Sequence, residues 1–144
     1  MKSLSHLYLS VYTNQFDPEI VNDYLKFEDS LVCKIGDTSI DGIIIKRNLW
    51  EKSLYIFKSY LLSNIKDNTF KLFESKANEF LILKQFPFEV SLNLVTYKNK
   101  NDVIGIDFTL SDFELLLNFG IEFTYNVYDY VSIPKDIKLQ SKKK

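Results

Sequence analysis

The chain is poor in the residue types that carry out most enzyme chemistry. Among its 144 residues it has a single histidine, His6, a single cysteine, Cys33, and four glycines. One histidine and one cysteine are too few for the usual zinc sites, and the glycines do not have the spacing of a phosphate-binding loop. Nothing in the spacing supplies the third, orienting group that a Cys33–His6 catalytic pair would need. We therefore expect no catalytic residues, no cofactor and no metal.

Two further absences concern location and charge. A lone cysteine excludes an internal disulfide bond, and the sequence shows no signal peptide and no apolar run long enough to cross a bilayer. We therefore expect a cytoplasmic protein without membrane contact. The net charge is −1, Arg47 is the only arginine, and without the lysines at 142–144 the body of the chain is acidic. Nucleic-acid binding depends on a basic surface and is therefore disfavoured.

What the sequence does contain is a regular alternation of apolar and polar residues, which predicts strands. The predicted strands are 5–13, 31–35, 43–50, 88–94, 103–109 and 121–127. We expect 31–35 to pair with 43–50, and 88–94 to pair with 103–109, as antiparallel hairpins. Helical spacing is found from Asp17 and Pro18 to about Phe27, over 53–65, over 68–80 and over 111–120, while residues 68–86 as a whole fit either helix or strand.

The stretch 101–130 has the clearest boundaries. Ser111 and Glu114 have the spacing of a capping box, and Gly120 is placed to end the helix in the left-handed conformation. The apolar positions of this helix are Leu110, Phe113, Leu115, Leu116 and Leu117, of which the first and third have the spacing of a hydrophobic staple. The stretch is therefore predicted to form a strand, a helix and a second strand.

The same order of strand, cap and helix occurs at 5–27, and the two stretches favour a split β-α-β arrangement with ferredoxin-like character. The alternative is that strand-to-helix turns simply resemble one another. We expect one α+β domain over 1–130, with an antiparallel or mixed sheet of about five or six strands and about three helices mostly on one face. Residues 131–144 are predicted to be a polar, basic and partly disordered tail.

Two groups of residues are candidates for binding a partner. An acidic run follows the first helix and its exit, and it is either an ordinary solvated face or a negative patch for a basic partner: Asp17, Glu19, Asp23, Glu28 and Asp29. Four tyrosines are placed to share an open face of the sheet: Tyr8, Tyr12, Tyr128 and Tyr130. Trp50 is predicted to be a core residue rather than an interface residue, because tryptophan is highly buried on average.

Several segments together resemble one bacterial family. They are F-D-P-E-I at 16–20, K-I-G-D at 34–37, the strand ending in Trp50, the Leu-rich helix at 54–65, I-G-I-D-F at 104–108 and N-V-Y at 126–128. Over about residues 5–130 the chain is similar to the family called domain of unknown function 4279. The family pattern falls on Lys34, Gly36, Asp37, Trp50, Gly120 and Tyr128. The resemblance implies that these residues are structural, and that some members are immunity proteins of polymorphic toxin systems.

These observations leave three hypotheses. The first is a non-catalytic protein-binding domain, an immunity-type protein that neutralises a partner toxin by covering it. The second is a ligand- or RNA-binding domain that stacks its target on the aromatic residues of an open sheet face. The third is an enzyme whose site the sequence does not reveal. The sequence leaves open whether the chain forms a homo-oligomer.

Overall fold

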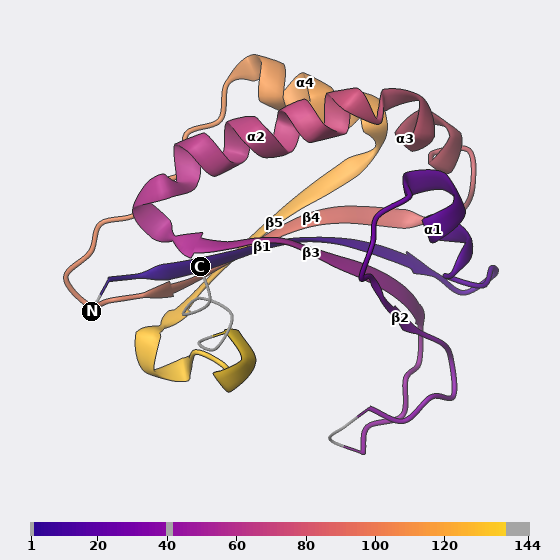
Figure 1. The fold of residues 1–144 in the computed structure, drawn as a ribbon, viewed down its shortest axis with the longest axis horizontal. Helices are drawn as coiled ribbons and strands as arrows, with labels where there is room; N and C mark the ends of the chain where they lie inside the picture. The colour runs from indigo at the N-terminus through magenta and orange to yellow at the C-terminus, as the bar shows by residue number, and fades with distance from the viewer. Residues whose placement is uncertain (1, 40–41, 138–144) are drawn as a thin grey trace.

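The computed structural model describes residues 2–39 and 42–137. Their strands form one mixed sheet of five strands in the order β2-β3-β1-β4-β5, with three main helices, α2, α3 and α4, and a shorter helix α1 (Figure 1). The strands are β1 (Leu4–Thr13), β2 (Leu31–Cys33), β3 (Asn48–Lys58), β4 (Glu89–Lys98) and β5 (Ile121–Asp129). The helices are α1 (Ile20–Leu25), η1 (Ser59–Leu61), α2 (Leu62–Ser75), α3 (Ala77–Leu83), α4 (Leu110–Phe119) and η2 (Tyr130–Ser132). The predicted α+β class is confirmed.

β1 is the central strand, and it is antiparallel to both of its neighbours, β3 and β4. β3 and β4 are therefore parallel to each other, and α2 and α3 connect them. β5 is parallel to β4 and follows α4, as parallel neighbours require a crossover connection. This order does not establish the ferredoxin-like character that the sequence suggested.

The main core lies between the sheet and the helices α1 to α4, which cover the same face, whereas η2 lies on the other side (Figure 1). Alternate residues of β1 point into it: Leu7, Leu9 and Val11 are almost fully buried. Aromatic side chains fill the space above them. Phe73 and Phe80 contact each other at 5.0 Å between ring centroids, and both are buried. The burial of these apolar side chains is the main contribution to the stability of a chain of this length.

A second, smaller cluster lies at one end of the sheet and includes the start of the C-terminal segment, which we define as residues 130–137. Its members are Leu4, Ile56, Val95, Tyr97, Ile133 and Ile137. The first part of the predicted tail therefore packs against the sheet through Ile133 and Ile137. The rest of that tail, 138–144, lies outside the described residues.

The predicted strand 103–109 is wrong. Residues 102–109 are an extended segment, here called the strap, that pairs with no strand. The hairpin with 88–94 does not form, because β4 already has β1 on one side and β5 on the other. Ile104, Ile106 and Phe108 are nevertheless partly buried and their neighbours are exposed. The alternation predicted which side chains turn inward, but inward-facing alternation does not require a ladder of backbone hydrogen bonds.

The predicted helix over 53–65 is wrong in its first half. β3 continues to Lys58, and helical structure begins at Ser59. The pairing between β1 and β3 shifts at Leu54, since Leu7 lies opposite Tyr55 while Tyr8 lies opposite Ser53. Such a bulge breaks the period of two, and the remaining apolar spacing then resembles that of a helix.

The predicted separation between a helix over 53–65 and a helix over 68–80 does not occur, because α2 runs without a break from Leu62 to Ser75. The segment 68–86 is helical as far as Leu83.

Helix α4 begins one residue earlier than predicted and has a different cap. The Thr109 hydroxyl accepts from the Asp112 N–H at 3.2 Å, and the Asp112 carboxylate accepts from the Thr109 N–H at 2.8 Å. Ser111 and Glu114 therefore do not form the box. Leu116 and Phe119 are buried, whereas three residues of the predicted apolar face of this helix are exposed: Leu110, Phe113 and Leu117. The staple between Leu110 and Leu115 is thus absent. Gly120 ends the helix at φ 67°, as predicted.

Candidate functional site

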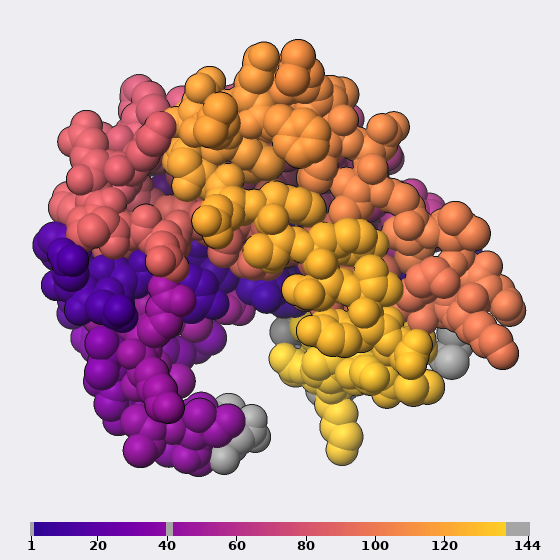
Figure 2. All heavy atoms as spheres, turned by 180° about the vertical axis from the view of Figure 1, so that it is seen from behind, coloured from indigo at the N-terminus to yellow at the C-terminus, as the bar shows by residue number. Residues whose placement is uncertain are grey.

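The face of the sheet opposite the helices carries the candidate binding surface, which we call the open face. The strand registers place these residues on it: His6, Tyr8, Ser10, Tyr12, Leu49, Glu51, Ser53, Ser91, Asn93, Glu122, Thr124, Asn126 and Tyr128. Viewed from behind, the molecule is hollowed between two projecting segments at this side of the sheet (Figure 2). One is the C-terminal segment, and the other is the connection between β2 and β3.

This connection, residues 34–39 and 42–47, is here called the arm, and it projects away from the sheet (Figure 1). It starts with a tight turn in which the Asp37 N–H donates to the Lys34 carbonyl at 3.0 Å. Gly36 stands at the third position of the turn with φ 94°, where glycine is strongly preferred. The Asp37 carboxylate also accepts from the Lys34 N–H at 2.8 Å. The K-I-G-D motif therefore shapes the root of the arm.

The arm is fixed to the sheet at its root and apolar farther out. Lys34 forms ion pairs with Asp17 at 3.2 Å and Glu19 at 3.8 Å. Asn48 accepts from the Ile35 N–H at 2.8 Å and donates to the Phe16 carbonyl at 3.0 Å. Three isoleucines of the arm are more than half exposed: Ile35, Ile43 and Ile44. The arm therefore presents apolar side chains to solvent from an anchored base.

Arg47, the last residue of the arm, lies over the open face. Its guanidinium is 4.6 Å from the centre of the Tyr12 ring and forms an ion pair with Glu89. Tyr12 and Glu89 are directly opposite each other in the β1–β4 register. The chain therefore fills one tyrosine–carboxylate pair of the open face with its own cation.

Three of the four candidate tyrosines lie on the open face. Tyr8 and Tyr12 come from β1, and Tyr128 comes from β5, where it is half exposed and stacks on Tyr97 at 6.0 Å between centroids. Burial, together with the nearby charge of Glu51, raises the pKa of Tyr8. The fourth, Tyr130, lies in η2 and packs against the smaller cluster. The sequence therefore identified residues that the fold brings to the same side of the sheet.

The centre of the open face is a hydrogen-bonded polar network. Asn93 donates to the Ser10 hydroxyl at 3.0 Å and to the Ser91 carbonyl at 3.2 Å, and it accepts from the Thr124 hydroxyl at 2.6 Å. These groups satisfy one another. A polar network that is already complete has little to gain from a new partner.

Glu51 is different from this network. It lies opposite Ser10 in β1 and opposite Leu31 in β2, and its side chain is partly buried. Burial raises the pKa of its carboxyl group above the ordinary value of 4.5. Among the described residues, no hydrogen bond or ion pair involves this carboxylate. Glu51 is therefore a partly desolvated acid to which no residue of the described ranges supplies a cation.

The acidic run is only partly available to a partner. Asp17 and Glu19 are paired with Lys34, and the Asp17 carboxylate also accepts from the Glu19 N–H at 3.0 Å. That backbone hydrogen bond, followed by the one from Lys34, lowers the pKa of Asp17. The remaining acids are exposed near α1: Asp23, Glu28 and Asp29. Asp17 was also predicted to cap the first helix, but α1 begins at Ile20, and Asp17 instead caps the preceding turn.

Trp50 is a core residue, as predicted, and takes no part in the open face. Its side chain is fully buried, and the indole N–H donates to the Asn22 side-chain oxygen at 2.7 Å. The same oxygen accepts from the Ser30 hydroxyl at 2.7 Å. These bonds tie α1 and the turn after it to β3.

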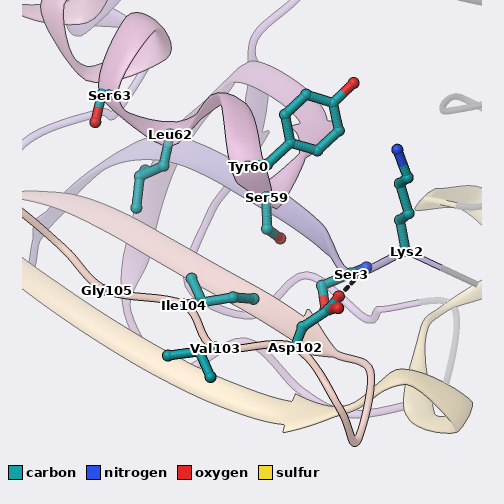
Figure 3. Close-up of a pocket in the computed structure, with 10 residues that line it drawn as sticks. All are labelled: Lys2, Ser3, Ser59, Tyr60, Leu62, Ser63, Asp102, Val103, Ile104 and Gly105. Atoms are coloured by element: carbon teal, nitrogen blue, oxygen red, sulfur yellow. Dashed lines mark hydrogen bonds between the residues drawn. The ribbon is translucent and has the colours of Figure 1, made fainter.

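A separate cavity of about 500 Å³ lies beside the first residues of the strap, Asp102 to Gly105 (Figure 3). It is lined by Lys2, Ser3, Ser59, Tyr60, Leu62, Ser63, Asp102, Val103, Ile104 and Gly105. The Asp102 carboxylate accepts from both the N–H and the hydroxyl of Ser3, at 3.0 and 2.6 Å, and the Lys2 ammonium lies 4.8 Å from the Tyr60 ring centre. Both charged groups of the lining thus have neighbours, Ser3 for Asp102 and Tyr60 for Lys2, and the bonds from Ser3 tie the strap to the N-terminal residues.

Within the described residues there is no group of three or more His, Cys, Asp or Glu side chains able to hold a metal ion. Burial, and then the charges of Asp37 and Glu51, raises the pKa of Cys33. A thiol with a raised pKa is a poor nucleophile at neutral pH. No helix in the described part of the chain is long and apolar enough to span a membrane.

No protein-family model matches the chain, and neither the curated proteins nor the solved structures contain a significant match to it. The similarity to domain of unknown function 4279 therefore stays a prediction.

Sequence reasoning missed the residues that distinguish this face. Glu51 follows the buried Trp50, so the alternation of β3 shows that Glu51 points away from the core. Only the register with β1 shows that it lies near Tyr8, and that register depends on the bulge at Leu54. The sequence also failed to predict that Ile43 and Ile44 are exposed, because an apolar run predicts a strand with a buried side.

Proposed function

We propose that this chain is a non-catalytic binding domain that holds a basic partner protein on its open face, between the arm and the C-terminal segment. The observation that carries the proposal is a sheet face that the helices leave uncovered and that is lined with tyrosines beside carboxylates. Tyrosine is enriched at interface hot spots. The helices complete the main core on the other face, so the open face contributes to the core only through the smaller cluster at one end of the sheet.

The charges of the open face favour a basic occupant. Glu51 and Glu122 form no ion pair among the described residues, and Glu89 is paired with Arg47. Complementary charge steers association and selects partners. The exposed isoleucines of the arm add apolar area beside these charges, as in the mixed surfaces of ordinary interfaces.

In line with the sequence resemblance, we propose that the partner is a toxin and that binding neutralises it by covering its active surface, in the cytoplasm of a bacterium. The test is co-expression with the protein encoded immediately upstream. We expect that protein to stop growth alone and this chain to restore growth. If no neighbouring product is toxic alone and rescued by this chain, the proposal fails.

A pair of tyrosine variants locates the interface. Tyr128→Ser removes a half-exposed ring from the open face, and Tyr60→Ser removes an exposed ring from η1, where it lines the separate cavity instead of the open face. Neither change empties the core, so both variants should fold. We expect Tyr128→Ser to weaken rescue and Tyr60→Ser to leave it unchanged. Equal rescue by both variants would exclude the part of the open face around Tyr128.

RNA is the main alternative occupant, since exposed tyrosines can stack bases. The carboxylates of Glu51, Glu89 and Glu122 oppose it, because they repel phosphate. A fluorescence titration with single-stranded oligonucleotides at low salt distinguishes the two. Saturable binding there would favour RNA over a basic protein.

A further inference from the structure

In the described part of the chain the open face contains two tyrosine–carboxylate pairs, and one of these pairs has a cation from that part. In the first, Arg47 lies over Tyr12 and pairs with Glu89. In the second, Tyr8 lies beside Glu51, and no described residue places a cation against that carboxylate. The first pair shows that a guanidinium fits between a ring and a carboxylate on this surface. The second pair has the same chemistry without the guanidinium.

The register brings the second pair together. Ser10 is directly opposite Glu51, and Tyr8 lies two residues before Ser10 on the same face of β1. Diagonal neighbours across an antiparallel pair are within reach of an aromatic side chain. Burial, together with the charge of Glu51, raises the pKa of Tyr8, and this effect of the charge agrees with the proximity of the two residues. The next positions on the same face of β3, Leu49 and Ser53, carry no charge, so they leave the carboxylate as the only ionic group of the site.

The two members of the pair are partly buried, and this makes the site selective. A partly desolvated carboxylate interacts with a cation more strongly than an exposed one does, because water screens the pair less. A ring face adds a cation–π contact, for which arginine is the more frequent protein donor. Arginine also suits the pair because its planar group can stack on the ring and donate to the carboxylate at the same time.

We propose that Glu51 and Tyr8 form the recognition site for a single arginine side chain of the partner protein. The inference rests on the proposed function, since it names the chemistry by which the open face recognises its occupant. The incoming guanidinium takes at Glu51 the place that Arg47 takes at Glu89. It supplies the missing charge to a carboxylate that the fold has already partly dehydrated.

The test uses the full chain and a small probe, so it does not require the partner. The probe is N-acetyl-arginine amide, and the comparison compounds are the citrulline and lysine analogues. Binding is followed by NMR chemical shifts of the Tyr8 ring and of the Ser10 and Glu51 amides. We expect saturable shifts at these residues with the arginine compound, weaker binding of the lysine compound and none with citrulline. Equal binding of the lysine compound would overturn the assignment to arginine.

Glu51→Gln and Glu122→Gln form a matched pair of variants, because each removes one carboxylate from the open face. We expect Glu51→Gln to weaken the arginine compound by about tenfold, the loss of one partly buried ion pair, and Glu122→Gln to change it by less than about twofold. Equal effects of the two substitutions would overturn the site.

The two proposals fail separately. If the probe does not bind at Glu51 while co-expression still rescues growth, the arginine site is wrong and the binding function stands. If the probe binds there and no neighbouring product is neutralised, the site stands and the proposed function is wrong.

Discussion

The two faces of the sheet are made from alternate residues of the same strands, but they differ in kind. In β1, Leu7 and Leu9 turn towards the helices, whereas Tyr8 and Ser10 turn away from them. The covered face is apolar and is closed by rings such as Phe73. The open face consists mainly of hydroxyls, amides, tyrosines and carboxylates, and it is apolar only at the end where the C-terminal segment packs on the smaller cluster.

This difference separates what holds the chain together from what can bind. Side chains of the covered face are already buried when the chain folds, so they have no exposed surface left to bury against a partner. On the open face, Asn93 and its neighbours already satisfy one another. The groups left to interact are the exposed ring of Tyr128, the pair of Tyr8 and Glu51, and the apolar side chains of the arm.

The largest expected effect comes from removing a ring from the covered face. Phe73→Ala should lower the free energy of unfolding by about 3–5 kcal/mol, because Phe73 is fully buried between Phe70 and Phe80. Chemical denaturation measures the change. Tyr128→Ala is the control on the open face and should stay within about 0.5 kcal/mol of the parent. Similar losses in the two variants would contradict the division between the faces.

The polar network of the open face should show a smaller effect. Asn93→Ala removes the donor to Ser10 and the acceptor for Thr124, and should cost about 1–3 kcal/mol, because buried hydroxyls lose their partners. Asn126→Ala, on the same face and exposed, is the matched control and should be nearly neutral. If the Asn93 variant is also neutral in denaturation, the network does not stabilise this face.

The sequence predicted the parts of the fold that depend on local chemistry. Strands β1, β4 and β5 were predicted correctly because their alternation of apolar and polar residues is uninterrupted. The end of α4 at Gly120 was also predicted, because glycine readily adopts the left-handed conformation. The errors arose where tertiary context decided the result. The strap has the alternation of a strand, but both sides of β4 are taken. β3 looked helical because of the bulge at Leu54.

The candidate site was only partly predictable for the same reason. Tyr8 and Tyr12 could be assigned to one face because they are four residues apart in the same strand, and every second residue of a strand points to the same side. The acidic run was visible as composition, but its pairing with Lys34 depends on how the arm returns to the β1–α1 turn. Glu51 carries no sequence signal of its own, since its importance comes from an absent cation and from a strand register.

The ion pair between Lys66 of α2 and Asp112 of α4 should have a smaller effect on stability again. Lys66 donates to the Asp112 carboxylate at 2.8 Å and to the Asp107 carbonyl at 2.6 Å, and both side chains of the pair are mostly buried. Burial alone would raise the pKa of Asp112, but the hydrogen bonds from Lys66 and Thr109 lower it below 3.8. The charged pair therefore contributes stability above that pH and loses it as the pH falls further.

Asp112→Asn should accordingly lower the free energy of unfolding by about 1 kcal/mol at neutral pH, after allowance for solvent screening, and by less as the pH falls below 3.8. Asp107→Asn is the control, because it makes the same change of net charge at an exposed side chain and leaves the Asp107 carbonyl in place. Denaturation curves at several pH values give the comparison. A loss that does not depend on pH would indicate that the charge of Asp112 is unimportant.

The smallest predicted change in the free energy of unfolding, that of Glu51→Gln, should be an increase instead of a decrease. Burial raises the pKa of Glu51 in the folded chain, so the folded state binds its proton more tightly than the unfolded state does. Stability linked to this group is therefore fully present below the ordinary pKa of 4.5 and is lost as the pH rises through the raised value. The charged form of this carboxylate is partly desolvated and has no cation among the described residues, and Glu51→Gln removes the cost of that charge.

We expect Glu51→Gln to increase the free energy of unfolding by roughly 0.5 kcal/mol at neutral pH, with the gain disappearing below pH 4.5. Glu122→Gln, at an exposed position of the same face, should not show this gain. Denaturation midpoints measured across the pH range provide the test, and a loss of stability in Glu51→Gln at neutral pH would mean that a cation of the chain already serves this carboxylate. A residue whose removal stabilises the fold while weakening arginine binding is one that the open face retains for its partner, because folding alone would favour glutamine there.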